Sequence, residues 1–151
     1  MHGSYEKPSL RFERRLAHPI EKVWRSITEP SELAQWFPSR VSGEVRLGAT
    51  LRFAFENGME IEGEVTEFEP PRRLAFFWGE DLLRFELDPD GDGTLLRFTD
   101  VLAEEDRASR DAAGWHVCLD RLEGGLVGDW RRYYEDYEAR GLPTGAQIPS
   151  A

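Results

Sequence analysis

Apolar and polar residues alternate along most of the chain between residues 41 and 101. Successive side chains of a β-strand point to opposite faces, so this alternation predicts a run of strands that each bury one face. Glycine-rich turn signals separate the strands, notably Asn57-Gly58 and the segment 88–93. Both residues of an Asn-Gly pair accept positive φ, which predicts a two-residue hairpin there. Strands joined by tight hairpins form an antiparallel meander.

Another alternating segment, residues 10–17, precedes this region and predicts a first strand. A helix is expected to start at Pro19, because proline is tolerated in the first turn of a helix. Ser31 is a candidate N-cap for a second short helix, which Pro38 ends. Two short helices therefore follow the first strand.

The last part of the chain has helical periodicity. Large apolar residues recur there at steps of three and four, which places them on one helical face: Trp115, Leu119, Leu122, Leu126, Trp130, Tyr133 and Tyr137. We expect one long helix from near Ser109 to near Arg140, with this face buried against the sheet. The predicted fold class is α+β, an antiparallel sheet of about six or seven strands wrapped around a long C-terminal helix.

The length of 151 residues suits one domain, which we place at residues 10–140 with flexible termini at 1–9 and 141–151. A formal net charge of -10 and the lack of a basic stripe argue against nucleic acid as a partner. We expect no membrane insertion, because no apolar run approaches the ~20 residues needed. With one cysteine and no secretory signal, the expected location is cytoplasmic.

The aromatic residues on the inner faces predict either a packed core or a cavity. Gly63 on an inner strand face, and Gly124, Gly125 and Gly128 in the helical segment, favour a cavity because glycine costs roughly 1 kcal/mol against alanine inside a helix. Gly125 borders the apolar face, whereas Gly124 and Gly128 point away from it and suit a bend of the helix. The residues expected to line it are Trp36, Phe53, Phe55, Ile61, Phe76, Trp78, Phe85, Trp115, Cys118, Leu119 and Leu122. The expected partner is a small apolar molecule.

Arg14 and His116 are the candidate polar groups of this cavity. Arg14 interrupts an inward-facing apolar row, with Asp129 and Asp100 as candidate partners, although snorkelling to solvent is favoured. His116 is read as a boundary residue with a hydrogen bond rather than as an acid or base. We identify no catalytic set, no cofactor and no metal site: His116 and Cys118, two apart on a helix, do not face each other.

Three stretches resemble a known family. They are residues 19–24 (PIEKVW) leading to 30–37 (PSELAQWF), residues 63–78 with PPRRLAFFW at their end, and Gly114-Trp115 followed by the apolar positions of the helix. In this order they are similar to the START-like, or SRPBCC, superfamily, which includes the birch pollen allergens. The similarity is greatest to its branch of homologues of the activator of heat-shock-chaperone ATPase.

The resemblance implies a helix-grip fold with a cavity for an apolar molecule, over residues 10 to 138. It leaves the function open, since fold does not determine activity. Our leading interpretation is that the protein binds a hydrophobic or aromatic ligand, lipids included. The resemblance also suggests that the protein is bacterial. The alternatives are a cyclase- or hydrolase-like enzyme and a chaperone-associated interaction protein. A homodimer stays open. The eukaryotic activators carry a further domain for which this chain has no room, so we expect no substantial stimulation of chaperone ATPase.

Overall fold

The computed structural model describes residues 8–141, which form one seven-stranded sheet and helices on one of its faces. All neighbouring strands are antiparallel, in the order β1-β7-β6-β5-β4-β3-β2. The strands are β1 (Ser9–Leu16), β2 (Arg40–Ser42), β3 (Thr50–Ala54), β4 (Glu60–Glu69), β5 (Arg73–Trp78), β6 (Asp81–Asp90) and β7 (Gly93–Val101). The helices are α1 (Ile20–Thr28), α2 (Pro30–Leu33), the 3-10 helix η1 (Glu105–Arg107), α3 (Ala108–Glu123) and α4 (Trp130–Ala139).

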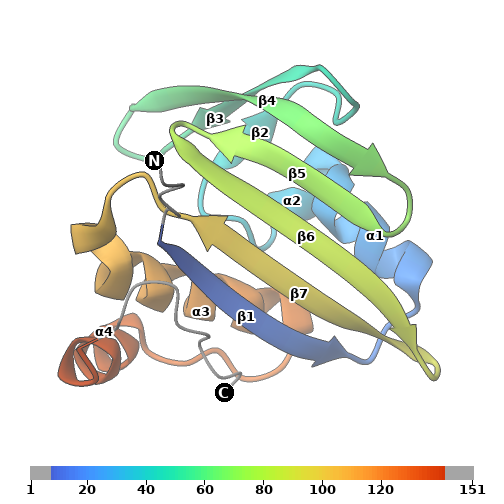
Figure 1. Cartoon of the computed structure of the whole chain (residues 1–151). Helices are drawn as coiled ribbons and strands as arrows, with labels where there is room; N and C mark the ends of the chain where they lie inside the picture. The colour runs from blue at the N-terminus through green and yellow to red at the C-terminus, as the bar shows by residue number, and fades with distance from the viewer. Residues whose placement is uncertain (1–7, 142–151) are drawn as a thin grey trace, which may run out of the picture.

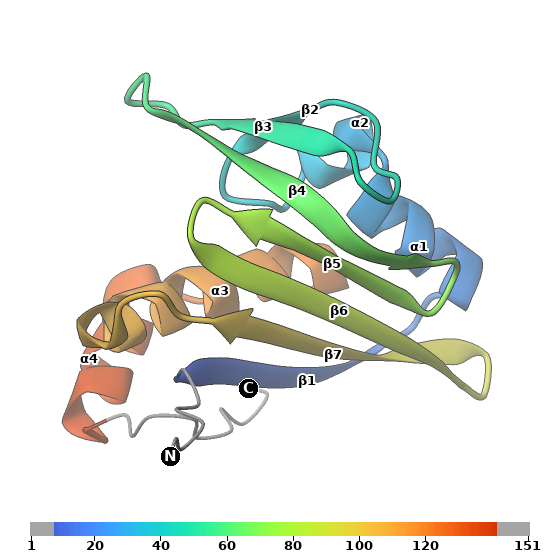
Figure 2. The same cartoon turned by 45° about the horizontal axis from the view of Figure 1, so that its top comes forward.

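The sheet curves around the helices, as Figures 1 and 2 show from two directions. α3 lies against the inner face beside β1 and β7, and α1 and α2 cover the other end of the same face. A strand, two short helices and six strands follow one another as expected, with helical structure after the last strand, which confirms the helix-grip α+β fold. No helix in the described part of the chain is long and apolar enough to cross a membrane.

An aromatic cluster fills the space between the sheet and α3. The Phe37 ring lies 5.6 Å from the Trp115 ring and 6.1 Å from the Phe53 ring, measured between centroids. Trp115 also packs on Phe98 at 4.7 Å and on Trp78 at 5.3 Å. These spacings are those of packed aromatic pairs, so the centre of the molecule is a solid core.

The C-terminal helical segment is two helices, which corrects the prediction of one continuous helix. α3 ends at Glu123 because Gly124 takes a left-handed conformation (φ 88°), and α4 begins at Trp130. Leu126, predicted to lie on the buried face, falls in the connection and is 98% exposed. The apolar period survives the break because α4 has a buried face of its own, which packs on α3.

The turn at Asn57-Gly58 joins β3 to β4, but its geometry differs from the expected two-residue loop. The Phe55 N–H donates to the Met59 carbonyl, and the Gly58 N–H donates to the Phe55 carbonyl. Of the two turn residues only Gly58 has positive φ, because the Asn57 side chain instead accepts a hydrogen bond from the Met59 N–H. The hairpin is therefore confirmed, and its loop is longer than predicted.

Gly63 owes its place to a close approach of two strands. A Cβ atom at this position would lie 1.6 Å from the Phe77 carbonyl oxygen of β5. Only a residue without a side chain fits between the two backbones. Gly63 was interpreted from the sequence as a sign of a cavity. The structure shows instead that glycine is needed there for β4 to lie next to β5.

Candidate functional site

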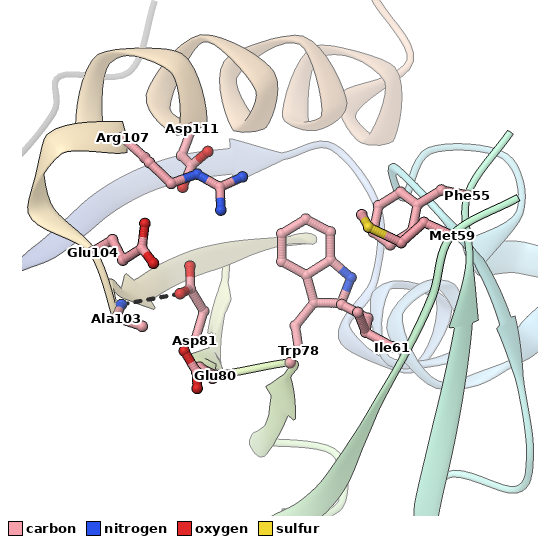
Figure 3. A pocket seen from close by; sticks show the side chains of 11 residues that line it. Phe55, Met59, Ile61, Trp78, Glu80, Asp81, Ala103, Glu104, Arg107 and Asp111 are labelled. Carbon is pink, nitrogen blue, oxygen red and sulfur yellow. Dashed lines mark hydrogen bonds between the residues drawn. The ribbon is translucent and has the colours of Figure 1, made fainter. Parts of the chain in front are cut away.

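A pocket of about 340 Å³ opens at the edge of the aromatic core, between the β3–β4 hairpin and the start of α3 (Figure 3). It is lined by Phe55, Met59, Ile61, Trp78, Gly79, Glu80, Asp81, Ala103, Glu104, Arg107 and Asp111. Its volume falls within the ~300–1,000 Å³ range typical of small-molecule sites.

One side of the pocket is apolar. Phe55, Met59 and Ile61 come from the β3–β4 hairpin, and the Trp78 indole stands between them and the opposite side (Figure 3). The Phe55 and Trp78 rings pack 5.7 Å apart, and Trp78 also contacts Trp115 in the core. Met59 is 53% exposed, so this apolar surface continues to the rim of the pocket.

The opposite side is acidic. Asp81 begins β6, Glu104 precedes η1, and Asp111 lies in the first turn of α3. Arg107 is the one basic side chain among the residues that line this pocket. An apolar wall facing an acidic wall suits a ligand with an apolar body and a cationic or hydrogen-bond-donating end.

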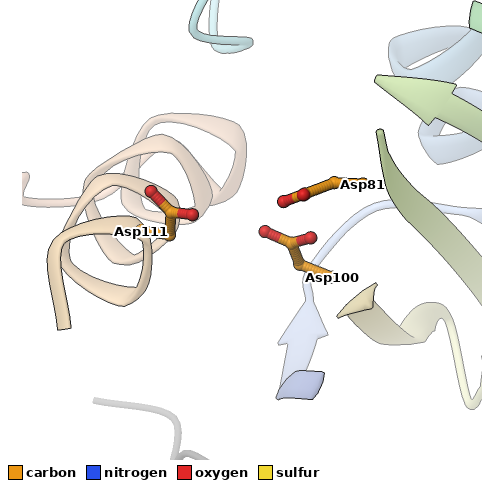
Figure 4. A group of neighbouring side chains, drawn as sticks. All are labelled: Asp81, Asp100 and Asp111. Carbon is orange, nitrogen blue, oxygen red and sulfur yellow. The ribbon is translucent and has the colours of Figure 1, made fainter. Parts of the chain in front are cut away.

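Asp100 lies beside this acidic wall, fully buried near the end of β7. One carboxylate oxygen from each of Asp81, Asp100 and Asp111 lies within 4.8 Å of the others, and Figure 4 shows the three groups turned toward one another. Asp100 Oδ2 accepts a hydrogen bond from Trp115 Nε1 at 2.8 Å. Asp81 Oδ1 accepts one from the Ala103 N–H at 3.0 Å.

Burial dominates the titration of this cluster. It raises the pKa of Asp100 from 3.8 to about 9, helped by the neighbouring Asp81 carboxyl group and opposed by the Trp115 hydrogen bond. Burial also raises the pKa of Asp111 to about 6, against the nearby Arg107 charge. The raised pKa keeps the Asp100 carboxyl group protonated near neutral pH.

The residues predicted to line a cavity fall into two groups. Phe55, Ile61 and Trp78 line the pocket. The other predicted residues belong to the packed core or to its border: Trp36, Phe53, Phe76, Phe85, Trp115, Cys118, Leu119 and Leu122. The burial of Cys118 raises the pKa of its thiol to about 12, as expected for a small apolar residue rather than a nucleophile.

Arg14 and His116 lie apart from the pocket, in a buried polar cluster between β1, α3 and α4. Arg14 is only 3% exposed and its Nη1 lies 3.0 Å from Asp120 Oδ1, which corrects both the snorkelling expectation and the suggested partners Asp129 and Asp100. His116 Nδ1 lies 2.7 Å from the Tyr137 hydroxyl oxygen, so its expected hydrogen bond is present. Burial, and next the Arg14 charge, lower the pKa of His116 to about 4.

Asp120 holds this cluster together. Its Oδ2 accepts hydrogen bonds from the Gly128 N–H (2.9 Å) and the Tyr133 hydroxyl (2.7 Å). Burial opposes ionisation, but these donors and Arg14 together lower the pKa of Asp120. The Tyr133 ring stacks on His116 with centroids 3.6 Å apart. The cluster thus fastens α4 and its preceding loop to α3, a structural role that occupies both predicted polar residues.

The sequence analysis did not identify the acidic cluster: it named only Asp100, as a candidate partner of Arg14, although Asp81 and Asp100 both carried a signal. Asp81 continues the inward row of Leu83 and Phe85 on β6, and Asp100 continues that of Phe98 on β7. Leu83 of β6 pairs with Asp100 of β7. Asp81, two residues before Leu83, is therefore the diagonal neighbour of Asp100 on the inner face. Asp111 carried no such signal, because only the docking of α3 brings it to the other two.

The chain resembles several solved structures. A conserved protein of unknown function from Enterococcus faecalis superposes with a TM-score of 0.74 at 24% identity, covering 87% of this chain and 84% of that one. A Bordetella parapertussis protein gives 0.72 at 25% identity, with 97% and 94% covered. The Aha1 dimer from Colwellia psychrerythraea gives 0.66 at 24% identity, with 78% and 97% covered.

No curated protein matches the chain. The model of one family, described as "Activator of Hsp90 ATPase homolog 1-like protein", matches residues 17–126. This match spans most of the sequence, and the solved structures share its fold. The chain therefore belongs to the family of Activator of Hsp90 ATPase homolog 1-like proteins.

Proposed function

We propose that this protein binds a small, largely apolar molecule in the pocket between the β3–β4 hairpin and the start of α3. The observation that carries the proposal is the open apolar wall of Phe55, Met59, Ile61 and Trp78 beside a closed core. When a ligand covers apolar side chains that face water in a concave site, the removal of their surface from water lowers the free energy.

The size of the pocket sets the expected affinity. Covering about 250 Å² of apolar ligand surface contributes about 6 kcal/mol at about 25 cal/mol per Å². Part of this is lost to the entropy of association, so we expect dissociation constants in the micromolar to millimolar range. The acidic wall favours neutral or cationic ligands over anionic ones, because Glu80, Asp81 and Glu104 repel negative charge.

The test is a fluorescence titration with a neutral environment-sensitive dye, followed by displacement with flavonoids and fatty acids. Met59→Glu places a charge on the apolar rim, and we expect it to weaken dye binding about tenfold. Leu47→Glu is the matched control, because Leu47 is exposed (61%) and does not line the pocket. Equal weakening by both variants, or no binding to the wild-type protein, contradicts the proposal.

A second candidate function is association with a protein partner. The observation in its favour is the exposed apolar segment formed by Leu126, Val127 and Trp130 at the α3–α4 connection. Its test compares the wild-type protein with Leu126→Asp by sedimentation, for self-association, and in a chaperone ATPase assay. Self-association or altered ATPase activity that occurs with the wild-type protein and not with Leu126→Asp supports this function. The same sedimentation and the same ATPase activity with both proteins argue against it.

A further inference from the structure

Asp100 is one of three residues in the described part of the chain, with Arg14 and His116, that have a buried side-chain polar atom without a hydrogen-bond partner. Its side chain has no exposed surface, and its Oδ1 has no hydrogen-bond partner among residues 8–141. Buried oxygen atoms are almost always paired, so an unpaired one needs an explanation. Asp100 Oδ1 belongs to a carboxyl group turned toward two other carboxyl groups, Asp81 and Asp111 (Figure 4).

The protein holds these carboxyl groups in place from outside the cluster. Trp115 Nε1 donates to Asp100 Oδ2, and the Ala103 N–H donates to Asp81 Oδ1. Hydrogen bonds of this kind orient metal ligands in known sites. Asp111 is carried by the first turn of α3, so the three ligands come from three different elements.

We propose that Asp81, Asp100 and Asp111 bind a hard divalent cation, of the Ca²⁺ or Mn²⁺ class, at the polar end of the pocket. An all-oxygen ligand set favours such ions over Zn²⁺ or Cu²⁺, which prefer nitrogen and sulfur ligands. Because Asp81 and Asp111 line the pocket, an ion has a route in, and water molecules from the pocket complete its coordination.

The spacing of the oxygen atoms fits an ion of this size. Two oxygens that each lie about 2.4 Å from one cation are at most about 4.8 Å apart, and three equally spaced ones about 4.2 Å, so the carboxyl groups need to turn only slightly to share one ion. The three carboxylate oxygens lie within 4.8 Å of one another. A larger cationic group, such as an organic ammonium, fits less well because Asp100 is closed to solvent and only a small ion reaches its oxygen.

Charge points the same way. Three ionised carboxylates at this spacing repel one another, and the burial of Asp100 strengthens the repulsion. Arg107 supplies one positive charge at the pocket, and it leaves the cluster with a net negative charge. A divalent cation bound among the three carboxyl groups compensates this charge.

The test is terbium luminescence of the full-length protein, freed of metal with a chelator and then dialysed. Tb³⁺ is a probe for Ca²⁺ sites. The Trp115 indole donates a hydrogen bond to Asp100, so it lies close enough to sensitise the emission of a bound Tb³⁺. We expect the emission to saturate at micromolar Tb³⁺ concentrations and to fall when Ca²⁺ or Mn²⁺ displaces the bound Tb³⁺. Asp111→Asn should weaken binding by about tenfold or more, and this half-buried position should tolerate the amide.

Asp136→Asn is the matched control, since Asp136 is an exposed aspartate of α4 away from the pocket. It corrects for ions gathered by the acidic surface, and we expect it to bind Tb³⁺ within about twofold of the wild-type protein. A second readout is thermal stability, which Ca²⁺ or Mn²⁺ should raise in the wild-type and Asp136→Asn proteins but not in Asp111→Asn. Equal Tb³⁺ binding by the two variants, or no sensitised emission at all, overturns the proposal. A primary amine that raises thermal stability where the metal ions do not overturns it as well.

Discussion

Arg14 of β1 and Asp120 of α3 form a buried ion pair, with 3.0 Å between Arg14 Nη1 and Asp120 Oδ1. Both side chains are almost completely shielded from solvent. Asp120 also accepts the hydrogen bonds that fix the loop before α4. The pair therefore joins the sheet, α3 and α4 at one point.

Asp120→Asn should lower the free energy of unfolding by about 3 kcal/mol or more, because it leaves the buried Arg14 charge with only the partly exposed Glu123 carboxylate, 3.4 Å from its Nη1. Urea unfolding measures the loss. Adding Arg14→Met to this variant should recover part of the stability, since the buried charge is then removed.

The control is Glu62→Gln, which neutralises one member of the exposed Arg52–Glu62 pair. Exposed ion pairs contribute little, so this change should stay within about 0.5 kcal/mol. If Asp120→Asn costs no more than Glu62→Gln, the buried pair does not anchor the helices.

Gly63→Ala should destabilise the fold by about 3 kcal/mol or more, because the new methyl group overlaps the Phe77 carbonyl and forces β4 and β5 apart. Thermal unfolding measures the effect. Gly125→Ala serves as the control: its Cβ meets nothing closer than 3.9 Å, at Glu123, and its φ is not positive. Similar melting temperatures for the two variants would rule out the close approach.

Stability should depend on pH through Asp100, whose pKa rises from 3.8 to about 9 on folding. Between these values the folded state binds a proton that the unfolded state has released, so stability falls as pH rises through this window. Asp100→Asn cannot ionise, and its stability relative to the wild-type protein should increase from about pH 4 to about pH 9.

Urea unfolding at several pH values, with a chelator present to remove metal ions, checks this dependence. The Asn side chain retains an oxygen that can accept the Trp115 hydrogen bond. A difference between the two proteins that stays constant with pH would show that Asp100 titrates normally.

The strands and their faces could be predicted from alternation alone, because each strand buries one side. The same alternation named Phe55, Ile61 and Trp78 together with residues of the packed core, because it shows which side chains face inward and not where the packing stops. The periodicity after Trp115 predicted helix correctly but not its interruption, since the α4 stripe packs on α3 and keeps the same spacing past Gly124.

The polar part of the site could not be predicted to the same extent. Asp81, Asp100 and Asp111 are separated in sequence by 19 and 11 positions, and only strand register and helix docking bring them together. Arg14 was identified as inward-facing, but its partner Asp120 depends on the angle at which α3 crosses β1. Contacts of this kind join segments that are far apart in the sequence, so the local pattern of apolar and polar residues does not predict them.

The most direct test of ligand binding is a two-dimensional ¹⁵N–¹H spectrum of the five tryptophan indole groups. Trp78 lines the pocket, whereas Trp24 packs on Phe68 outside it, and the Trp78→Phe variant assigns the Trp78 signal. Titration with a ligand from the dye-displacement panel should shift the Trp78 signal saturably and leave the Trp24 signal in place. A ligand that binds while the Trp78 signal stays unchanged would contradict the assignment of this pocket.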